Sequence, residues 1–188
     1  TRAIVDDDSS ATVNSSRNSC LVLPMGLDNE CRLLFKFSLL CAQVCPDIPF
    51  IWRLHPDVTF KSVFSKNGEF RRLPANIILS KNSLAQDIEL SRWSIYRGTT
   101  AIVQAIGAGV RPVYFDIPGE INIDPLEDLN DWRITVSEPD DFKRFVEVDR
   151  DQPFPDDPGF RLAKAFCKNL FTPLTARVFE DAIVETHV

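Results

Sequence analysis

Residues 93–116, WSIYRGTTAIVQAIGAGVRPVYFD, decide the fold that the sequence predicts. The β-rich run 93–96 is followed by the breaker Gly98, and a second β-rich run occupies 112–115. The apolar segment 101–106 between them is flanked by a hydroxyl pair and by two glycines, which are typical start and stop signals of a helix. The stretch therefore predicts strand, turn, short helix and strand, the repeating unit of a parallel α/β sheet.

The turn before this short helix carries two adjacent hydroxyls, at Thr99 and Thr100. Either threonine is a suitable N-cap. A helix N-terminus also presents unpaired N–H groups and the positive end of the helix dipole, so the turn suits a phosphate group. The alternative is an ordinary strand–helix turn with a good cap, and this stretch alone does not separate the two.

Similar elements occur along most of the chain. The predicted strands are 20–26, 50–54, 76–80, 93–96, 112–115 and 132–136. The predicted helices are 30–44, 83–90, 101–106, 141–148, 160–170 and 174–184. Short apolar strands that alternate with helices indicate an α/β fold, a three-layer, doubly wound parallel sheet with helices on both faces. Ligands of such sheets bind beyond the carboxyl ends of the strands.

Two helix starts and one irregular segment carry more specific expectations. Asp28 or Asn29 is the expected N-cap of the first helix, and Ser83 that of the second. Residues 59–73 mix Lys, Arg and Phe and predict a loop with one helical turn.

The domain organisation follows from changes in composition. Residues 1–19 are polar and predict a flexible linker, and 20–150 form the α/β domain. Residues 151–188 begin with an Asp- and Pro-rich connector and continue into helices, which would pack on this domain or on another one.

The composition is that of a soluble globular protein, with 188 residues, 44% of them apolar, and a net charge of −6. This charge argues against nucleic acid as a partner, and an anionic ligand would need a local basic pocket. Five cysteines without a CxxC pair, and only two histidines, predict buried thiols in a reducing cytoplasm and no metal site. No apolar run approaches the roughly 20 residues of a membrane span.

Groups that suit a nucleotide phosphate follow three of the predicted strands. They are Arg53 and His55, then Ser80 and Lys81, and finally Gly98, Thr99 and Thr100. Arginine supplies a fixed charge, and histidine can donate a hydrogen bond even when neutral. Each group by itself also has an ordinary structural interpretation. Because all of them follow strands of one parallel sheet, we expect a phosphate site at its carboxyl edge.

The order of these elements resembles the C-terminal, donor-binding half of a GT-B glycosyltransferase. The resemblance covers about residues 20–124 and is carried by FIWRLHP, NIILS and SIYRGTTAIVQAIGAGVRPVYF. It is similar in particular to bacterial sialyltransferases, polysialyltransferases and glycerophosphotransferase-like enzymes. Those have an HP motif, a Ser motif and a paired Ser/Thr motif around a CMP- or CDP-linked donor. The matching positions here are His55-Pro56, Ser80 and Thr99-Thr100.

The resemblance implies roles for these residues. His55 would be the catalytic residue that contacts the donor phosphate and stabilises the departing nucleotide. Thr99 and Thr100 would hold phosphate, and Ser80 would lie near the base or ribose. Gln104 stands where many GT-B enzymes have a ribose-binding Glu, and its neutral amide argues against a standard UDP- or GDP-dependent retaining mechanism.

The resemblance also implies partners and a setting. The donor would be a nucleotide-sugar linked to CMP, CDP or UDP, the acceptor a saccharide, and no further cofactor or metal would be needed. An N-terminal GT-B domain would supply the catalytic base and the acceptor site. The expected setting is bacterial surface polysaccharide synthesis, of capsule or lipopolysaccharide, in the cytoplasm at the inner membrane. Asp116 or Glu120, after the fifth strand, would reach a sugar hydroxyl.

Two other functions remain open from the sequence. A nucleotide-sugar epimerase or hydrolase on the same fold would need further acidic and basic residues beside the glycine turn. A non-catalytic, doubly wound interaction domain would bind no nucleotide.

Overall fold

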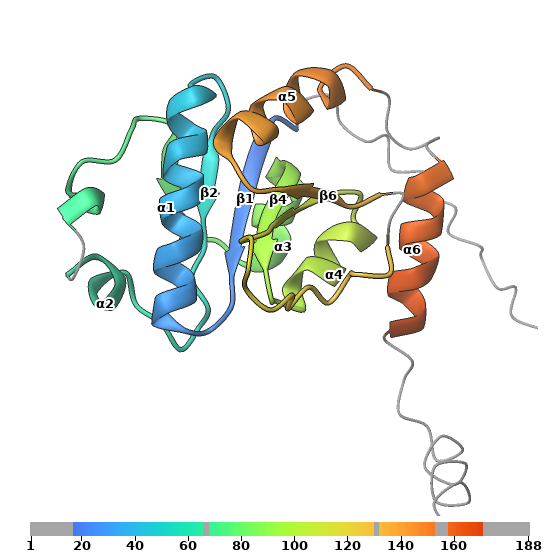
Figure 1. Ribbon diagram of the computed structural model, residues 1–188, viewed down its shortest axis with the longest axis horizontal. Helices are drawn as coiled ribbons and strands as arrows, with labels where there is room; N and C mark the ends of the chain where they lie inside the picture. The colour runs from blue at the N-terminus through green and yellow to red at the C-terminus, as the bar shows by residue number, and fades with distance from the viewer. Residues whose placement is uncertain (1–16, 66–67, 130–131, 153–157, 171–188) are drawn as a thin grey trace, which may run out of the picture.

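Six short strands pair in parallel because each carries apolar side chains on both faces and each is separated from the next by a helix or a long loop. The computed structural model describes residues 17–65, 68–129, 132–152 and 158–170. The strands lie in the order β3-β2-β1-β4-β5-β6 (Figure 1). Their bounds are β1 (Ser19–Pro24), β2 (Phe50–Trp52), β3 (Ile77–Leu79), β4 (Ser91–Arg97), β5 (Arg111–Phe115) and β6 (Ile134–Val136).

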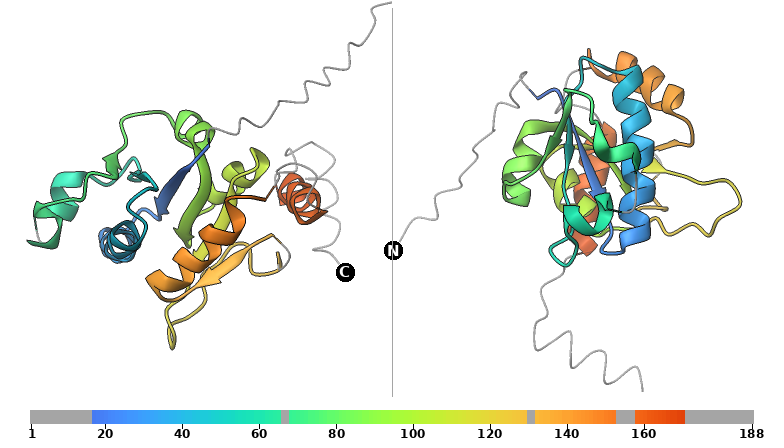
Figure 2. Two further views of the ribbon diagram at one scale, coloured as in Figure 1. Left: turned by 90° about the horizontal axis from the view of Figure 1, so that it is seen from above. Right: turned by 90° about the vertical axis from the view of Figure 1, so that its left-hand side faces the viewer.

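Helices cover both faces of this sheet, which forms the middle of three layers (Figure 2). They are α1 (Asp28–Val44), α2 (Phe60–Phe64), α3 (Leu84–Leu90), α4 (Ala101–Gly107), α5 (Pro139–Asp149) and α6 (Pro158–Leu170), with a 3₁₀ turn at Gly68–Arg71. On one face α1 packs beside α5, and on the other α4 packs beside α6. The predicted α/β doubly wound architecture is therefore confirmed.

The core lies on the two sides of β1. Cys20 and Val22 point into the cluster under α1 and α5, whereas Leu21 and Leu23 point into the cluster under α3 and α4. All four side chains are buried. Such two-sided burial explains why the strands have almost no polar alternation in the sequence.

The chain reverses its direction of sheet growth between β1 and β4. After β1 it adds β2 and β3 on one side, then returns to place β4, β5 and β6 on the other. β1 and β4 pair directly, with Val22 opposite Ile95. This is the topological switch point of the sheet, and the strand ends beside it are the expected place for a ligand.

The expected N-cap of α1 is wrong, whereas the N-cap expected for α4 is confirmed in position. The N-cap of α1 is Leu27, and Asp28 and Asn29 lie inside the first turn. The Asp28 carboxylate instead accepts a hydrogen bond from the Ser62 hydroxyl of α2 at 3.3 Å. Thr100 is the N-cap of α4, but its helical dihedrals leave its side chain without a capping bond. The Ala101 N–H instead donates to Thr99 Oγ1 at 3.4 Å.

Other local expectations fare better. Ser83 caps α3 in a complete capping box with Gln86. Residues 59–73 contain more helix than predicted, because Thr59 caps α2 through the Ser62 N–H and the 3₁₀ turn follows. The predicted helix 174–184 and most of the predicted linker lie outside the described residues. Among the helices that the structure does describe, none is long and apolar enough to cross a membrane.

Candidate functional site

The carboxyl ends of β2 and β3 enclose an open pocket of about 400 Å³. Its polar lining comprises Arg53, His55, Thr59, Ser80, Lys81 and Asn82, and its apolar lining Leu54, Pro56, Val58 and Phe60. The structure thus brings together four of the residues that the sequence singled out, from two strand ends. Two cations and one histidine among hydroxyl and amide groups are the chemistry that an anionic ligand needs.

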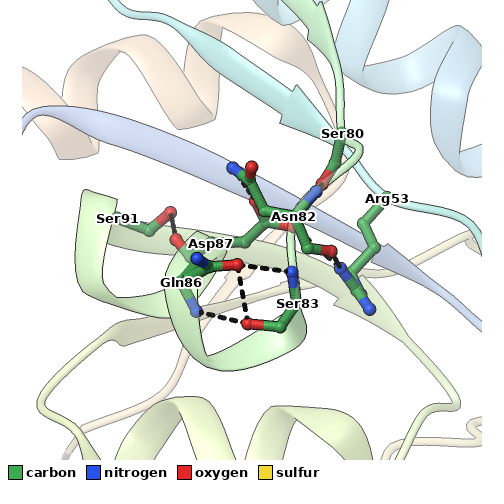
Figure 3. Close-up of polar contacts among 7 residues, drawn as sticks. All are labelled: Arg53, Ser80, Asn82, Ser83, Gln86, Asp87 and Ser91. Atoms are coloured by element: carbon green, nitrogen blue, oxygen red, sulfur yellow. Dashed lines mark hydrogen bonds and ion pairs between the residues drawn. The ribbon is translucent and has the colours of Figure 1, made fainter.

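A buried carboxylate, Asp87 of α3, lies behind this pocket (Figure 3). Its Oδ2 accepts hydrogen bonds from Arg53 Nη1 at 2.9 Å and from Ser80 Oγ at 2.5 Å. Its Oδ1 accepts one from Asn82 Nδ2 at 3.0 Å. Asp87 is 0% exposed. One carboxylate therefore contacts three of the polar side chains that line the pocket.

The capping box of α3 explains how Asp87 reaches that place. Gln86 N–H donates to Ser83 Oγ at 3.3 Å, and Gln86 Oε1 accepts from Ser83 N–H at 2.9 Å (Figure 3). The helix therefore begins immediately after the loop that follows β3. At the other end of the helix, Ser91 Oγ donates to the Asp87 carbonyl at 2.7 Å. These bonds fix the start of α3 and its junction with β4, while the Asp87 carboxylate joins the helix to Arg53 and Ser80 after β2 and β3.

His55, the candidate catalytic residue, has 42% of its side chain exposed. Its Nδ1 lies 3.4 Å from the Asp57 backbone N and 3.4 Å from Asp57 Oδ2. The first contact needs Nδ1 as an acceptor, which places the hydrogen of a neutral ring on Nε2. The second needs Nδ1 as a donor, and Nε2 then carries a hydrogen only if the ring is doubly protonated. In the first arrangement Nε2–H can donate to a phosphate oxygen.

The orientation of the His55 ring is set by the loop after β1. A Cβ on Gly26 would lie 2.9 Å from His55 Nδ1 and 3.1 Å from its Cγ, closer than real contacts allow. The imidazole therefore packs against the Gly26 backbone, and only glycine leaves room for this ring position.

Gly98, Thr99 and Thr100 lie apart from that pocket, because β1 separates the end of β4 from the end of β2. Gly98 has a positive φ of 66°, and a Cβ there would approach Ile123 Cδ1 to 2.7 Å and Met25 Sδ to 3.1 Å. None of the three residues lines the pocket of Arg53 and His55. The loop 25–26 joins the two places. Its Gly26 lies against the His55 ring, and its Met25 lies against Gly98, so the loop lies between the pocket and the turn 98–100.

The β4 end of the sheet is acidic. Arg97 is 4% exposed, and its Nη1 and Nη2 donate to Glu30 Oε2 at 2.7 Å and to Glu120 Oε2 at 2.5 Å. Burial disfavours the charge of Arg97, but its bonds and attraction to Glu30 and Glu120 outweigh this and raise its pKa. Two carboxylates on one guanidinium leave a net negative group here, beside Asp116 after β5. Half of the Glu120 side chain is exposed to solvent.

Gln104 is placed differently from the other predicted site residues. It is exposed on α4 and lines a shallow hollow between α4 and α6, together with Lys164 and Lys168. None of the other predicted site residues lines that hollow. We predicted from the sequence that Gln104 lies near the strand-end residues. Its position on α4 instead places it beside α6.

The cysteines offer no nucleophile to this site. All five are free and buried. Burial raises the pKa of Cys31, Cys45 and Cys167 to about 11, so these thiols stay protonated near neutral pH. In the part of the chain that the structure describes, no three His, Cys, Asp or Glu side chains gather in a way that could hold a metal ion.

Sequence reasoning missed Asp87 and Asn82. The signal for Asp87 was present, because position 87 lies three residues after Leu84, on the stripe of α3 that faces inward. A charged residue on an inward stripe needs a partner, and the structure shows that this partner is Arg53. Asn82 gave no comparable signal, since an exposed loop asparagine usually contacts only water.

Two solved glycosyltransferases share this fold. The glycotransferase of kitacinnamycin superposes with a TM-score of 0.55 at 15% identity, over 90% of this chain and 42% of that one. SnogD from Streptomyces nogalater superposes with a TM-score of 0.51 at 17% identity, over 83% of this chain and 39% of its own. At such identities the likeness establishes the fold alone, and this chain spans about two fifths of either protein. No family model and no curated protein matches the sequence.

Proposed function

We propose that this chain is the donor-binding half of a GT-B glycosyltransferase that transfers a sugar from a CMP-, CDP- or UDP-linked donor to a saccharide acceptor. The observation that carries the proposal is the pocket at the ends of β2 and β3, where Arg53, His55 and Lys81 meet. The pocket lies on the carboxyl edge of a doubly wound sheet, where such folds bind ligands, and β2 is the neighbour of β1 at the switch point. The shared fold with two glycosyltransferases supports the same assignment.

In this proposal His55 is the catalytic group. Its Nε2–H donates to an oxygen of the donor phosphate and stabilises the negative charge that develops as the nucleotide departs. Arg53 and Lys81 add fixed positive charge to the same pocket. The acceptor hydroxyl displaces the nucleotide without a metal ion, and its proton goes to a base on an N-terminal domain.

The hydrogen-bond donors along the edge suggest how a nucleotide-sugar lies across it. We place the phosphate with His55, Lys81 and the remaining donors of Arg53, whose charge is partnered by Asp87. The carboxylates of Glu30 and Glu120 repel an anion from the β4 end. Sugar hydroxyls, in contrast, donate well to carboxylates. We therefore assign the sugar to the side of Glu120, with Gly98, Thr99 and Thr100 between the two. Gln104 stays a proposed ribose contact through its amide.

The wider setting belongs to the same proposal. The transferred sugar would enter a bacterial surface polysaccharide, at the cytoplasmic side of the inner membrane. The acceptor site would lie on the N-terminal domain, so the chain by itself would bind the nucleotide without turnover.

Calorimetric titration with CMP, CDP, UDP and GDP tests the proposal. We expect one of these nucleotides to bind and its affinity to fall in His55→Ala and in the Thr99→Ala/Thr100→Ala double variant. Arg144→Ala, whose side chain is exposed on α5, is the control and should bind as the wild type does. Absence of binding to the wild type, even after an N-terminal half is added, would favour the interaction domain instead.

A further inference from the structure

Asp87 is an unusual residue to find without solvent exposure. A buried carboxylate costs several kcal/mol unless hydrogen bonds and an opposite charge compensate it. Here Arg53, Ser80 and Asn82 provide that compensation, and all three line the same pocket. The pairing therefore links the stability of α3 to the geometry of a candidate ligand site.

The contacts of Asp87 determine where the two cations of the pocket lie. Arg53 Nη1 donates both to Asp87 Oδ2 and to the Asn82 carbonyl, the latter at 2.7 Å. Because a guanidinium is planar, two acceptors on one nitrogen set the plane and direction of the other donors. Only 24% of the Arg53 side chain is exposed, so this orientation is also confined by packing.

Lys81 is held through its two neighbours. The Ser80 hydroxyl donates to Asp87, and the Asn82 amide donates to the other carboxylate oxygen. Ser80 Oγ in turn accepts from the Asn82 N–H at 3.2 Å. The backbone on both sides of Lys81 is thus attached to Asp87, and the Ser80 proton is used inside the protein rather than offered to a ligand.

We propose that Asp87 is a positioning residue that holds Arg53 and Lys81 as one phosphate-binding pair. The proposal rests on the function proposed above, in which this pocket takes the donor phosphate. Asp87 does not itself contact the ligand; it acts through Arg53, Ser80 and Asn82.

The substitution Asp87→Asn distinguishes positioning from simple electrostatics, because the two predict opposite changes in the affinity for an anion. The substitution removes a negative charge behind the pocket, and Coulomb attraction alone would then strengthen the binding of an anion. Loss of positioning has the opposite effect, because Arg53 and the loop of Lys81 lose their shared acceptor. We expect inorganic pyrophosphate to bind Asp87→Asn about tenfold more weakly than the wild type at constant ionic strength.

Asp149 offers a matched control. It is also buried, at 4% exposure, and accepts a bond from Arg92 Nε at 3.2 Å. It contacts Trp93 and Arg111, which lie near the amino ends of β4 and β5, so it lies at the opposite end of the strands from the pocket. Asp149→Asn makes the same chemical change and should leave pyrophosphate affinity within about twofold. A double variant, Asp87→Asn/Arg53→Lys, should bind little worse than Asp87→Asn alone, because the two residues act as a unit.

Asn82→Ala is the second variant, since its exposed side chain can be removed without opening the core. The substitution removes the bond between the loop of Lys81 and Asp87 Oδ1, and it should weaken pyrophosphate binding several-fold. Circular dichroism and melting curves establish folding of each variant. Unchanged or tighter binding by a folded Asp87→Asn would overturn the proposal. If Asp87→Asn fails to fold, unchanged pyrophosphate binding by Asn82→Ala would overturn the proposal.

The nucleotide series separates this proposal from the proposed function. If pyrophosphate binding depends on Asp87 but none of CMP, CDP, UDP and GDP binds more tightly than pyrophosphate, positioning stands and the nucleotide role fails. If a nucleotide binds and Asp87→Asn leaves its affinity unchanged, only the positioning role fails. If the wild type binds neither class of ligand, both are overturned.

Discussion

The contact between Gly26 and His55 predicts that one added methyl group disables the candidate catalytic residue. In Gly26→Ala the new Cβ would lie 2.9 Å from Nδ1, 3.1 Å from Cγ and 3.3 Å from Cε1 of the imidazole. An ordinary contact needs about 3.4 Å or more, so the ring must shift by several tenths of an ångström or rotate. Because 42% of the His55 side chain is exposed, the ring has room to turn toward solvent.

The cost in stability should be small. A side chain displaced from its preferred rotamer costs about 0.5–1.5 kcal/mol. Gly26 does not have a positive φ, so alanine also gains about 0.4–1 kcal/mol by restricting the unfolded chain. We therefore expect the free energy of unfolding to change by less than about 1 kcal/mol.

The cost in binding should be larger. A hydrogen bond to a charged phosphate contributes about 1.5–3 kcal/mol, which corresponds to about ten- to a hundredfold in affinity. Gly26→Ala should lose most of the nucleotide affinity that His55→Ala loses. The double variant should bind only slightly more weakly than His55→Ala. Calorimetry with the best nucleotide measures affinity, and the imidazole resonances in NMR spectra report the ring position.

Gly68→Ala is the matched control, because a Cβ there meets nothing within 4 Å and its φ is not positive. It should change stability by less than about 1 kcal/mol and leave binding unchanged. Wild-type affinity in Gly26→Ala, combined with a loss in His55→Ala, would refute the claim that the loop after β1 sets the ring. A loss of several kcal/mol in stability would show that the contact is too rigid to yield.

Three further predictions follow from other contacts. Gly98→Ala should destabilise the fold by about 2 kcal/mol or more in urea unfolding, because of its positive φ and the nearby Ile123. Adding Ile123→Ala to this variant should restore part of the lost stability. If it restores none, backbone strain alone causes the loss. Hydrogen bonds from the backbone N–H groups of Glu138 and Ser137 lower the pKa of Asp141. Its contribution to stability is therefore present above its ordinary pKa and is lost as the pH falls through the lowered pKa. The stability deficit of Asp141→Asn at pH 7 should shrink as the pH falls through that range, and a constant deficit would contradict this. The cysteines of the native protein should react with Ellman's reagent at pH 8 far more slowly than those of the unfolded protein, since burial raises the pKa of Cys31 to about 11. Rapid reaction of even one thiol per native chain would be inconsistent with the buried cysteines.

The sequence predicted the local elements well where the deciding signals are local. The glycines and prolines that separate the strands, and the capping box that begins at Ser83, act within a few residues, so they can be read directly. Asp28 is not the N-cap of α1 because the helix begins one residue earlier, after Leu27, and its carboxylate contacts a hydroxyl 34 residues away. Thr100 is the N-cap of α4 as predicted, but its helical dihedrals prevent a capping bond from its side chain.

The candidate site was predicted in part. Arg53, His55, Ser80 and Lys81 do share one pocket. The sequence could not show that Gly98 to Thr100 lie beyond β1, or that Gln104 faces α6, because strand order and helix rotation depend on packing between distant segments.

The sequence by itself determined the kinds of element, their order along the chain and the chemical groups at the end of each strand. These follow from propensity, periodicity and capping within short windows. Only the tertiary structure decided which strand ends are neighbours, and hence that Arg53 and Lys81 share one pocket beside β2 while Glu30 and Glu120 meet at Arg97 beside β4. The tertiary structure also decided that Asp87 is buried behind Arg53. Parallel pairing joins residues that lie dozens of positions apart, and the choice among partners is made by the packing of the helices over both faces of the sheet.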